Sequence, residues 1–198
     1  MPNHITNVIE LKEATQDRVN EILEVIKNDE VGLGSIDFNK LIPMPDHIFR
    51  GNLGQEEREL YGRDNWYDFS VSHWGSKWNA YDFAPYNEGE NIIEFHTAWS
   101  TVPQILHALS EKYPDVLFKH QWADEDFGFN LGEQEYNGGE VIGENIPAGG
   151  SKEAYEMAAD IMGYELEDLG LHLSEDGLTY EYTKEDEVPD IEQGGMQM

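Results

Sequence analysis

The chain has 198 residues, and its 41 Asp and Glu residues against 12 Lys and Arg residues give a formal net charge of −29 at pH 7. Such a negative field repels nucleic acid and anionic membranes, which argues against direct binding of DNA, RNA or lipid headgroups. There is no cysteine, so disulfides, thiolate metal sites and a cysteine nucleophile are excluded.

The length and the apolar content of 39% predict one globular domain with a sizeable core. No apolar run approaches the roughly 18 residues of a membrane span, and the N-terminal sequence lacks the basic and apolar regions of a signal peptide. Together with the absence of cysteine, these features predict a cytoplasmic protein. No sequence motif for a cofactor is present.

At the N-terminus the pattern predicts a strand, a helix and a second extended segment. Polar and apolar residues alternate over residues 4–11, as in a half-buried strand. Thr15 is the predicted N-cap of the following helix. The apolar stripe of that helix is Val19, Ile22, Leu23 and Ile26. Residues 35–42 are predicted to be extended up to Pro43, because proline cannot donate to a sheet, and a short helix is expected at 56–61.

Residues 65–86 are the most informative stretch, since eight of these 22 residues are aromatic. Asp64 is the predicted N-cap of a helix that Gly75 ends, because glycine readily adopts the left-handed conformation of a helix stop. Residues 77–83 then alternate as a strand does. So many aromatic side chains in one segment either build a core or form a binding surface. The large area that each ring can bury favours the core.

The second half of the chain supplies two further strands around a helix. The alternation over residues 91–99 predicts a strand. Thr101 is the predicted N-cap of the helix that follows, in which Pro103 is tolerated in the first turn. Residues 116–122 alternate as the next strand, and residues 127–131 are expected to be its hairpin partner.

This order predicts an α+β, ferredoxin-like antiparallel sheet built on a split βαβ unit. The ferredoxin-like domain is predicted to span residues 1–144, with a helical and aromatic insertion at about 43–75. Residues 145–198 are predicted to form an acidic C-terminal α/β extension, in which Ser151 caps a helix and residues 171–182 form a hairpin. The last residues of this extension are expected to fray.

Four segments together resemble a known family. They are MPNHITN at the N-terminus, FNKLIPMP at 38–45, NWYDFSVSHWGSKWNAY at 65–81 and FHTAWSTVPQILHALSEKYPDVLF at 95–118. Over about residues 1–140 the chain is similar to the YubB-like proteins of phages and conjugative plasmids, a group with a ferredoxin-like domain and no established activity. The resemblance implies a mobile-element origin and brings no catalytic residues. Many relatives have Trp-Cys where this chain has His4-Ile5, which argues against an essential thiol or indole there.

The seven histidines are scattered without a short metal-binding spacing. In a ferredoxin-like order, the first strand lies between the strands that carry His96 and His120. His4 and Glu94 could then join them on the open face of the sheet and hold a zinc ion, provided that the register places them all on one face. The alternation of His120 with aromatic residues favours a buried, hydrogen-bonded imidazole instead.

The negative charge is concentrated in residues 121–198, where 21 acidic residues face only Lys152 and Lys184, a net charge of −19. This charge either only keeps the protein soluble or attracts a basic partner. The leading hypothesis is a non-enzymatic interaction protein that binds a basic host protein, conceivably by placing carboxylates where the phosphates of a nucleic acid would lie. The predicted acidic contacts are Asp124, Glu125 and Asp126, together with Glu185, Asp186 and Glu187.

Four tryptophans are further candidates for this interaction surface, should their rings be exposed. They are Trp66, Trp74, Trp78 and Trp99. The surrounding negative charge suits a peptide or a basic protein better than RNA. Two alternative functions stay open: a metal-binding or hydrolytic module that uses the histidines of the open sheet face, and a structural or assembly component of a phage. The sequence does not identify the partner or the oligomeric state.

Overall fold

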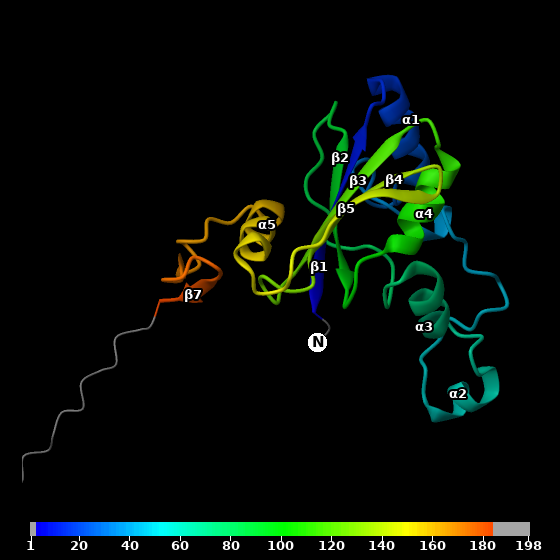
Figure 1. Ribbon diagram of the computed structural model, residues 1–198. Helices are drawn as coiled ribbons and strands as arrows, with labels where there is room; N and C mark the ends of the chain where they lie inside the picture. Colours follow the sequence, from blue (N-terminus) through cyan, green and yellow to red (C-terminus); the bar gives the residue numbers. More distant parts are fainter. Residues whose placement is uncertain (1–2, 184–198) are drawn as a thin grey trace, which may run out of the picture.

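The computed structural model describes residues 3–183 (Figure 1). Its centre is a five-stranded antiparallel sheet in the order β2-β1-β3-β4-β5. The strands are β1 (His4–Lys12), β2 (Ile92–Ala98), β3 (Leu117–Asp124), β4 (Gly132–Asn137) and β5 (Glu140–Asn145). The first strand therefore lies between the strands that carry His96 and His120, as the ferredoxin-like order predicts.

Helices cover both faces of this sheet (Figure 1). On one face lie α1 (Gln16–Ile26) and α4 (Pro103–Lys112), and on the other lies α5 (Lys152–Met162). The predicted caps Thr15 and Ser151 are confirmed, because each hydroxyl oxygen accepts a backbone N–H of the first turn. The cap predicted at Thr101 is wrong, because the Thr101 hydroxyl donates to Asn7 Oδ1 instead.

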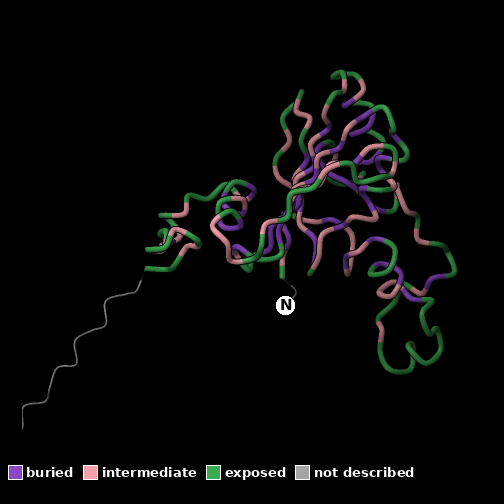
Figure 2. Tube along the Cα trace, viewed as in Figure 1, coloured by how far each residue is buried: buried purple, intermediate pink, exposed green. Residues whose placement is uncertain are grey.

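The alternation of β1 divides its side chains between the two faces. Ile9 and Leu11 are buried in the main core under α1 and α4, together with the predicted apolar stripe of α1 (Figure 2). Val8 points to the other face and packs against a smaller core. The smaller core consists of Ala123, Leu131, Ala154, Ala158 and Ile161. Because each large buried aliphatic side chain contributes about 1.5–3 kcal/mol, the α1 and α4 face stabilises the sheet more than the α5 face does.

The order β2-α4-β3, with β1 between the two strands, is the split βαβ unit of a ferredoxin-like fold, so the predicted α+β fold class is confirmed. The extended segment predicted at 35–42 is wrong. This segment forms a short 3₁₀ turn, η1 (Phe38–Lys40), because the turn places the Phe38 ring in the core while the Asp37 side chain accepts the backbone N–H of Asn39.

The strand predicted at 77–83 forms only in part. Tyr81 and His96 exchange two backbone hydrogen bonds, of 3.1 and 2.7 Å, and the N–H of Ala84 donates to the carbonyl of Glu94 at 3.0 Å. These bonds place the segment along the outer edge of β2, where the second strand of a ferredoxin-like unit would lie. They also bring the end of the aromatic block beside the sheet.

Between α1 and β2, a segment that carries three short helical elements projects from the sheet (Figure 1). It contains α2 (Gln55–Tyr61), α3 (Trp66–Phe69) and a π-helical turn, η2 (Ser70–Trp74). Asn65, and not Asp64 as predicted, caps α3, because the Asn65 side-chain oxygen accepts the N–H groups of the first turn. Gly75 ends η2 at a φ of 83°, as predicted.

The hairpin partner predicted at 127–131 is wrong. These residues form a turn, because the Asp124 carboxylate accepts hydrogen bonds from Asp126 and Asn130 and folds the chain back, and β4 begins only afterwards. After α5, the strands β6 (Leu171–Leu173) and β7 (Tyr180–Tyr182) form the predicted hairpin. Within residues 3–183, no helix has the length and apolar character needed to cross a membrane.

Candidate functional site

The four candidate tryptophans have different environments, and only Trp74 is buried. Trp74 is only 3% exposed, and its ring packs against Phe38 and Phe69 in the core. Its Nε1–H donates to the carbonyl of Ile42 at 2.9 Å. Trp66 lies in the projecting segment, at the start of α3. Trp74 is therefore a core residue that a partner cannot contact.

The predicted acidic contacts also differ from one another. Asp124 is only 5% exposed, and its carboxylate accepts hydrogen bonds from Asn3 Nδ2, the Asp126 N–H and Asn130 Nδ2. These bonds stabilise the turn after β3, so the role of Asp124 is structural. Glu125 and Asp126 are exposed. The candidates Glu185, Asp186 and Glu187 lie outside the described residues.

The strand register places the candidate histidines on two different faces. His96 pairs with an even-numbered residue of β1, whereas His120 pairs with an odd-numbered one. Because successive residues of a strand point to opposite faces, His96 points to the α5 face and His120 to the α1 and α4 face. The predicted grouping of His4, Glu94, His96 and His120 around one ion is therefore wrong. Among residues 3–183, no three His, Asp or Glu side chains are grouped closely enough to hold a metal.

His120 is fully buried and neutral. Asn7 Nδ2 donates to the Ile5 carbonyl and to Thr97 Oγ1, so Asn7 Oδ1 is an acceptor. His120 Nε2 lies 3.1 Å from that oxygen and therefore carries the proton, while Nδ1 has no partner in the part of the chain that the structure describes. Burial lowers the pKa of His120 to about 3, because an apolar environment disfavours the charged imidazolium. This is the buried, hydrogen-bonded imidazole that the aromatic alternation predicts.

On the α5 face, the rings of His4, Tyr81 and His96 form a cluster. The Tyr81 hydroxyl lies 2.7 Å from His4 Nδ1, and the three ring centroids are 5.7 to 6.0 Å apart in pairs. The Nδ1 atom of His96 is buried, has no hydrogen-bond partner among the described residues and lies 3.6 Å from Asp82 Oδ2. A protonated His96 would thus face a carboxylate.

A cavity of about 380 Å³ opens in front of this cluster, and we call it the open-face pocket. It is lined by His4, Thr6, Asp82, Glu94, His96, Glu125, Met162 and Tyr164. Glu125 lies beside His4 because its N–H donates to the His4 carbonyl at 3.0 Å. Glu94 and His96 share one face of β2, since they are two residues apart. The lining combines three carboxylates with two imidazoles, which favours a positively charged ligand.

The surroundings of the pocket add to its negative character. Met162 is the last residue of α5, so the partial negative charge of a helix C-terminus lies beside the carboxylates. Burial first, and then the charges of Asp82 and Glu125, raise the pKa of Tyr81. Asp82 has a φ of 47°, a left-handed conformation that short polar residues tolerate better than others. Strained backbone of this kind is concentrated at functional sites.

Next to the pocket, the ammonium group of Lys77 lies over two indole rings. Lys77 Nζ is 4.5 Å from the ring centroid of Trp78 and 4.8 Å from that of Trp99, within the range of cation–π attraction. Trp99 is 46% exposed, and Trp78 is half-buried. We call Trp78 and Trp99, the two rings over which Lys77 lies, the indole site. The Trp78 ring lies 6.1 Å from the Tyr81 ring, which in turn contacts His4 and His96 of the open-face pocket, so the indole site lies near that pocket.

Two segments distant in sequence position the indole site. Ser76 Oγ accepts the N–H of Ala98 at 3.2 Å, and the Ser100 hydroxyl donates to the Gly75 carbonyl. Trp99 has a φ of 71°, which is an outlier for so large a residue. These backbone contacts, and not a local helix or strand, hold the exposed ring beside Lys77.

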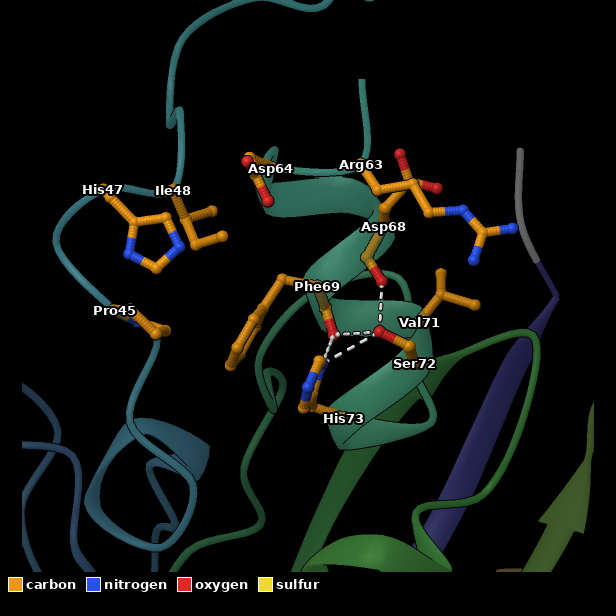
Figure 3. A pocket seen from close by; sticks show the side chains of 10 residues that line it. All are labelled: Pro45, His47, Ile48, Arg63, Asp64, Asp68, Phe69, Val71, Ser72 and His73. Atoms are coloured by element: carbon orange, nitrogen blue, oxygen red, sulfur yellow. Dashed lines mark hydrogen bonds between the residues drawn. The ribbon is translucent and has the colours of Figure 1, made fainter. Parts of the chain in front are cut away.

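A larger cavity of about 620 Å³ lies between the loop at 45–48 and the segment α3–η2 (Figure 3). His73 stacks on Phe69 with centroids 4.2 Å apart, and its Nδ1 contacts the Phe69 carbonyl and Ser72 Oγ. The Ser72 hydroxyl donates to the carbonyl of Asp68 at 2.6 Å. Because these groups satisfy the π-helical turn, they do not form a nucleophile and base pair, and the open-face pocket is the better candidate.

Sequence reasoning identified His4, Glu94 and His96 but did not identify Tyr81 or Asp82. Nothing distinguishes Asp82 among 41 acidic residues until the chain pairs with the edge of β2 and brings it to His96. The available signal was the alternation over residues 77–83, which predicted a strand without indicating its partner.

Comparison with known proteins supports the fold. Residues 73–165 match a family model described as the ferredoxin-like domain in Api92-like protein. The match covers just under half of the chain, and it includes the indole site and the pocket residues outside β1. No curated protein and no solved structure matches the chain.

Proposed function

We propose that this protein is a non-enzymatic binding protein that takes up a basic segment of a partner protein, with the ferredoxin-like sheet as its scaffold. An arginine side chain of the partner would enter the open-face pocket, and the neighbouring part of the partner would contact the indole site. The observation that carries the proposal is the lining of the pocket, to which residues 3–183 contribute three carboxylates and no Lys or Arg side chain.

The carboxylates of the pocket are available to such a partner. Within the described part of the chain, neither Glu94 nor Glu125 has a Lys or Arg within 4 Å, and Asp82 faces only His96. A guanidinium group offers several N–H donors in a planar arrangement that matches carboxylates. Arginine therefore satisfies this pocket better than a neutral side chain does.

The charge of the whole chain supports the same partner class. A net charge of −29 accelerates the encounter with a basic protein and repels nucleic acid. The resemblance to YubB-like proteins supports an origin in a phage or plasmid and a partner in the bacterial cytoplasm. A basic nucleic-acid-binding host protein fits this description, and the carboxylates would then lie where phosphates lie in its usual ligand.

The test is the affinity for a fluorescent arginine-rich peptide, measured at about 0.1 M salt, where charges within about 10 Å interact. The pocket variant replaces Asp82→Asn, Glu94→Gln and Glu125→Gln. Because each exposed ion pair contributes about 0.2–1 kcal/mol, this variant should bind about tenfold more weakly.

The control variant carries the same charge change at three exposed carboxylates outside the pocket, Glu30→Gln, Glu56→Gln and Glu111→Gln. It should lose much less affinity than the pocket variant. Equal losses in the two variants would mean that only the net charge attracts the peptide, and the proposed site would then be wrong.

A further inference from the structure

The indole site holds a cation that belongs to the chain itself. In residues 3–183, Lys77 is in no ion pair with a carboxylate, although the chain has 41 acidic residues. Its ammonium group lies over the rings of Trp78 and Trp99 instead. The two rings therefore provide an environment in which an ammonium group is stable.

We propose that Trp78 and Trp99 form a binding site for the side-chain ammonium group of a lysine of the partner, including its N-methylated forms. Lys77 occupies this site when no partner is bound and is displaced when one binds. The inference deepens the proposed function and rests on it for the identity of the partner, since it names the chemistry of a second contact beside the open-face pocket.

The geometry favours a site that exists before binding. Indole is the aromatic ring that attracts cations most strongly. The Trp99 backbone, at a φ of 71°, is held by the hydrogen bond from its N–H to the Asn3 carbonyl at 2.9 Å. The Trp78 ring contacts Tyr81, whose hydroxyl is bonded to His4. The Trp99 backbone and the Trp78 ring are thus anchored independently of Lys77.

Lys77, in contrast, can leave the site. It is partly exposed, and its ammonium group ends a flexible four-carbon chain that moves readily into water. The carboxylates of the nearby open-face pocket raise the local concentration of cations. An ammonium group of a partner therefore needs only to displace the mobile Lys77 side chain in order to contact Trp78 and Trp99.

The experiment titrates the full chain with Nα-acetyl-trimethyllysine amide, and separately with its neutral isostere in which carbon replaces the ammonium nitrogen. Binding is followed by NMR through the indole N–H signals, which single Trp→Phe variants assign. The test variant is Lys77→Gln. The control is Lys112→Gln, which makes the same charge change at a lysine that lies 5.6 Å from the ring centroid of Tyr113, outside the site.

Removal of the competitor should increase the affinity for the ammonium probe about fivefold, the equivalent of one cation–π contact. The signals of Trp78 and Trp99 should shift, while that of the buried Trp74 stays unchanged. Lys112→Gln should bind as the wild-type chain does. Adding Trp99→Leu to Lys77→Gln should abolish the gain.

Three results would overturn the inference: equal affinity in Lys77→Gln and Lys112→Gln, equal binding of the probe and its neutral isostere, or shifts confined to other tryptophans. Lys77→Met serves as a second test variant, since it keeps the aliphatic length while removing the charge. The probe carries no arginine, so the pocket variant at Asp82, Glu94 and Glu125 should retain the gain that Lys77→Gln produces. Failure of the indole site and failure of the arginine pocket are thus distinguishable.

Discussion

His120 and His96 lie on the two strands that flank β1, yet their surroundings differ in every respect that matters for binding. His120 points to the α1 and α4 face, where burial lowers its pKa to about 3 and its Nε2–H is bonded to Asn7. His96 points to the α5 face, where it lies beside His4 and three carboxylates in an open pocket. The register of one sheet therefore makes one imidazole a core residue and the other a candidate binding group.

The tryptophans repeat this contrast. Trp74 is 3% exposed and packs within the main core, whereas Trp99 is 46% exposed and its ring lies under the ammonium group of Lys77. The tryptophans thus supply both core and surface, and the preference for the core that the sequence indicates holds for Trp74 but not for Trp99. Substitutions on the two sides should accordingly separate stability from binding.

The largest difference is expected between Trp74→Ala and Trp99→Ala. Removal of the buried ring should lower the free energy of unfolding by about 3–5 kcal/mol, because it leaves a cavity in the core. Removal of the exposed ring should cost less than about 1 kcal/mol. Urea unfolding of the two variants measures both values, and similar costs would contradict the division between core and surface.

The next effect concerns the pH dependence of stability. The pKa of His120 in the folded state, about 3, is below its usual value of 6.5, so the folded state binds this proton less well than the unfolded state does. The neutral His120 therefore contributes stability that is fully present above about pH 6.5 and is lost as the pH falls toward 3. By pH 4 the loss should reach about 3 kcal/mol.

The variant His120→Gln should flatten this dependence between pH 6.5 and pH 4, because glutamine does not titrate. His107→Gln is the matched control, since His107 is exposed on α4. Urea unfolding at constant ionic strength measures both profiles. A His120→Gln profile as steep as that of wild type would show that His120 is not the group responsible.

A smaller effect is expected at the contact between α5 and the sheet. Ala158 is completely buried there, so Ala158→Leu should overpack the smaller core and cost about 1–3 kcal/mol in unfolding free energy. Met162 ends the same helix, Tyr164 follows it, and both line the pocket, so the variant should also weaken binding of the arginine-rich peptide. Unchanged affinity in a destabilised protein would show that α5 does not shape the pocket.

The smallest effect on stability is expected for Asp82→Asn. Asparagine tolerates the left-handed conformation at least as well as aspartate, so the free energy of unfolding should change by less than about 0.5 kcal/mol. The affinity for the arginine-rich peptide should fall about threefold, the equivalent of one exposed ion pair. A large loss of stability would mean that Asp82 supports the fold and not the site.

Much of the scaffold could be predicted from the sequence because it depends on local pattern. Thr15 and Ser151 cap helices whose apolar stripes are evident, and Gly75 ends a helical segment, so these features need no tertiary information. The segment at 35–42 was predicted wrongly because its apolar residues indicate burial but not the way in which burial is reached. Phe38 enters the core from a 3₁₀ turn.

The site was less predictable because it depends on pairing between distant segments. The face on which His120 lies follows from the register, and a shift of one residue reverses it. Asp82 reaches His96 only because the chain pairs with the edge of β2, and Lys77 reaches Trp99 only through contacts between two loops. Neither relation leaves a periodic signal in the sequence.

The central claim is that the α5 face, and not the α1 and α4 face, binds a basic segment. The most direct test is NMR of the histidine side chains during titration with the arginine-rich peptide, with signals assigned through His→Gln variants. The imidazole signals of His4 and His96 should shift in proportion to saturation, while those of His120 stay unchanged. Binding that leaves His4 and His96 unaffected would contradict the account.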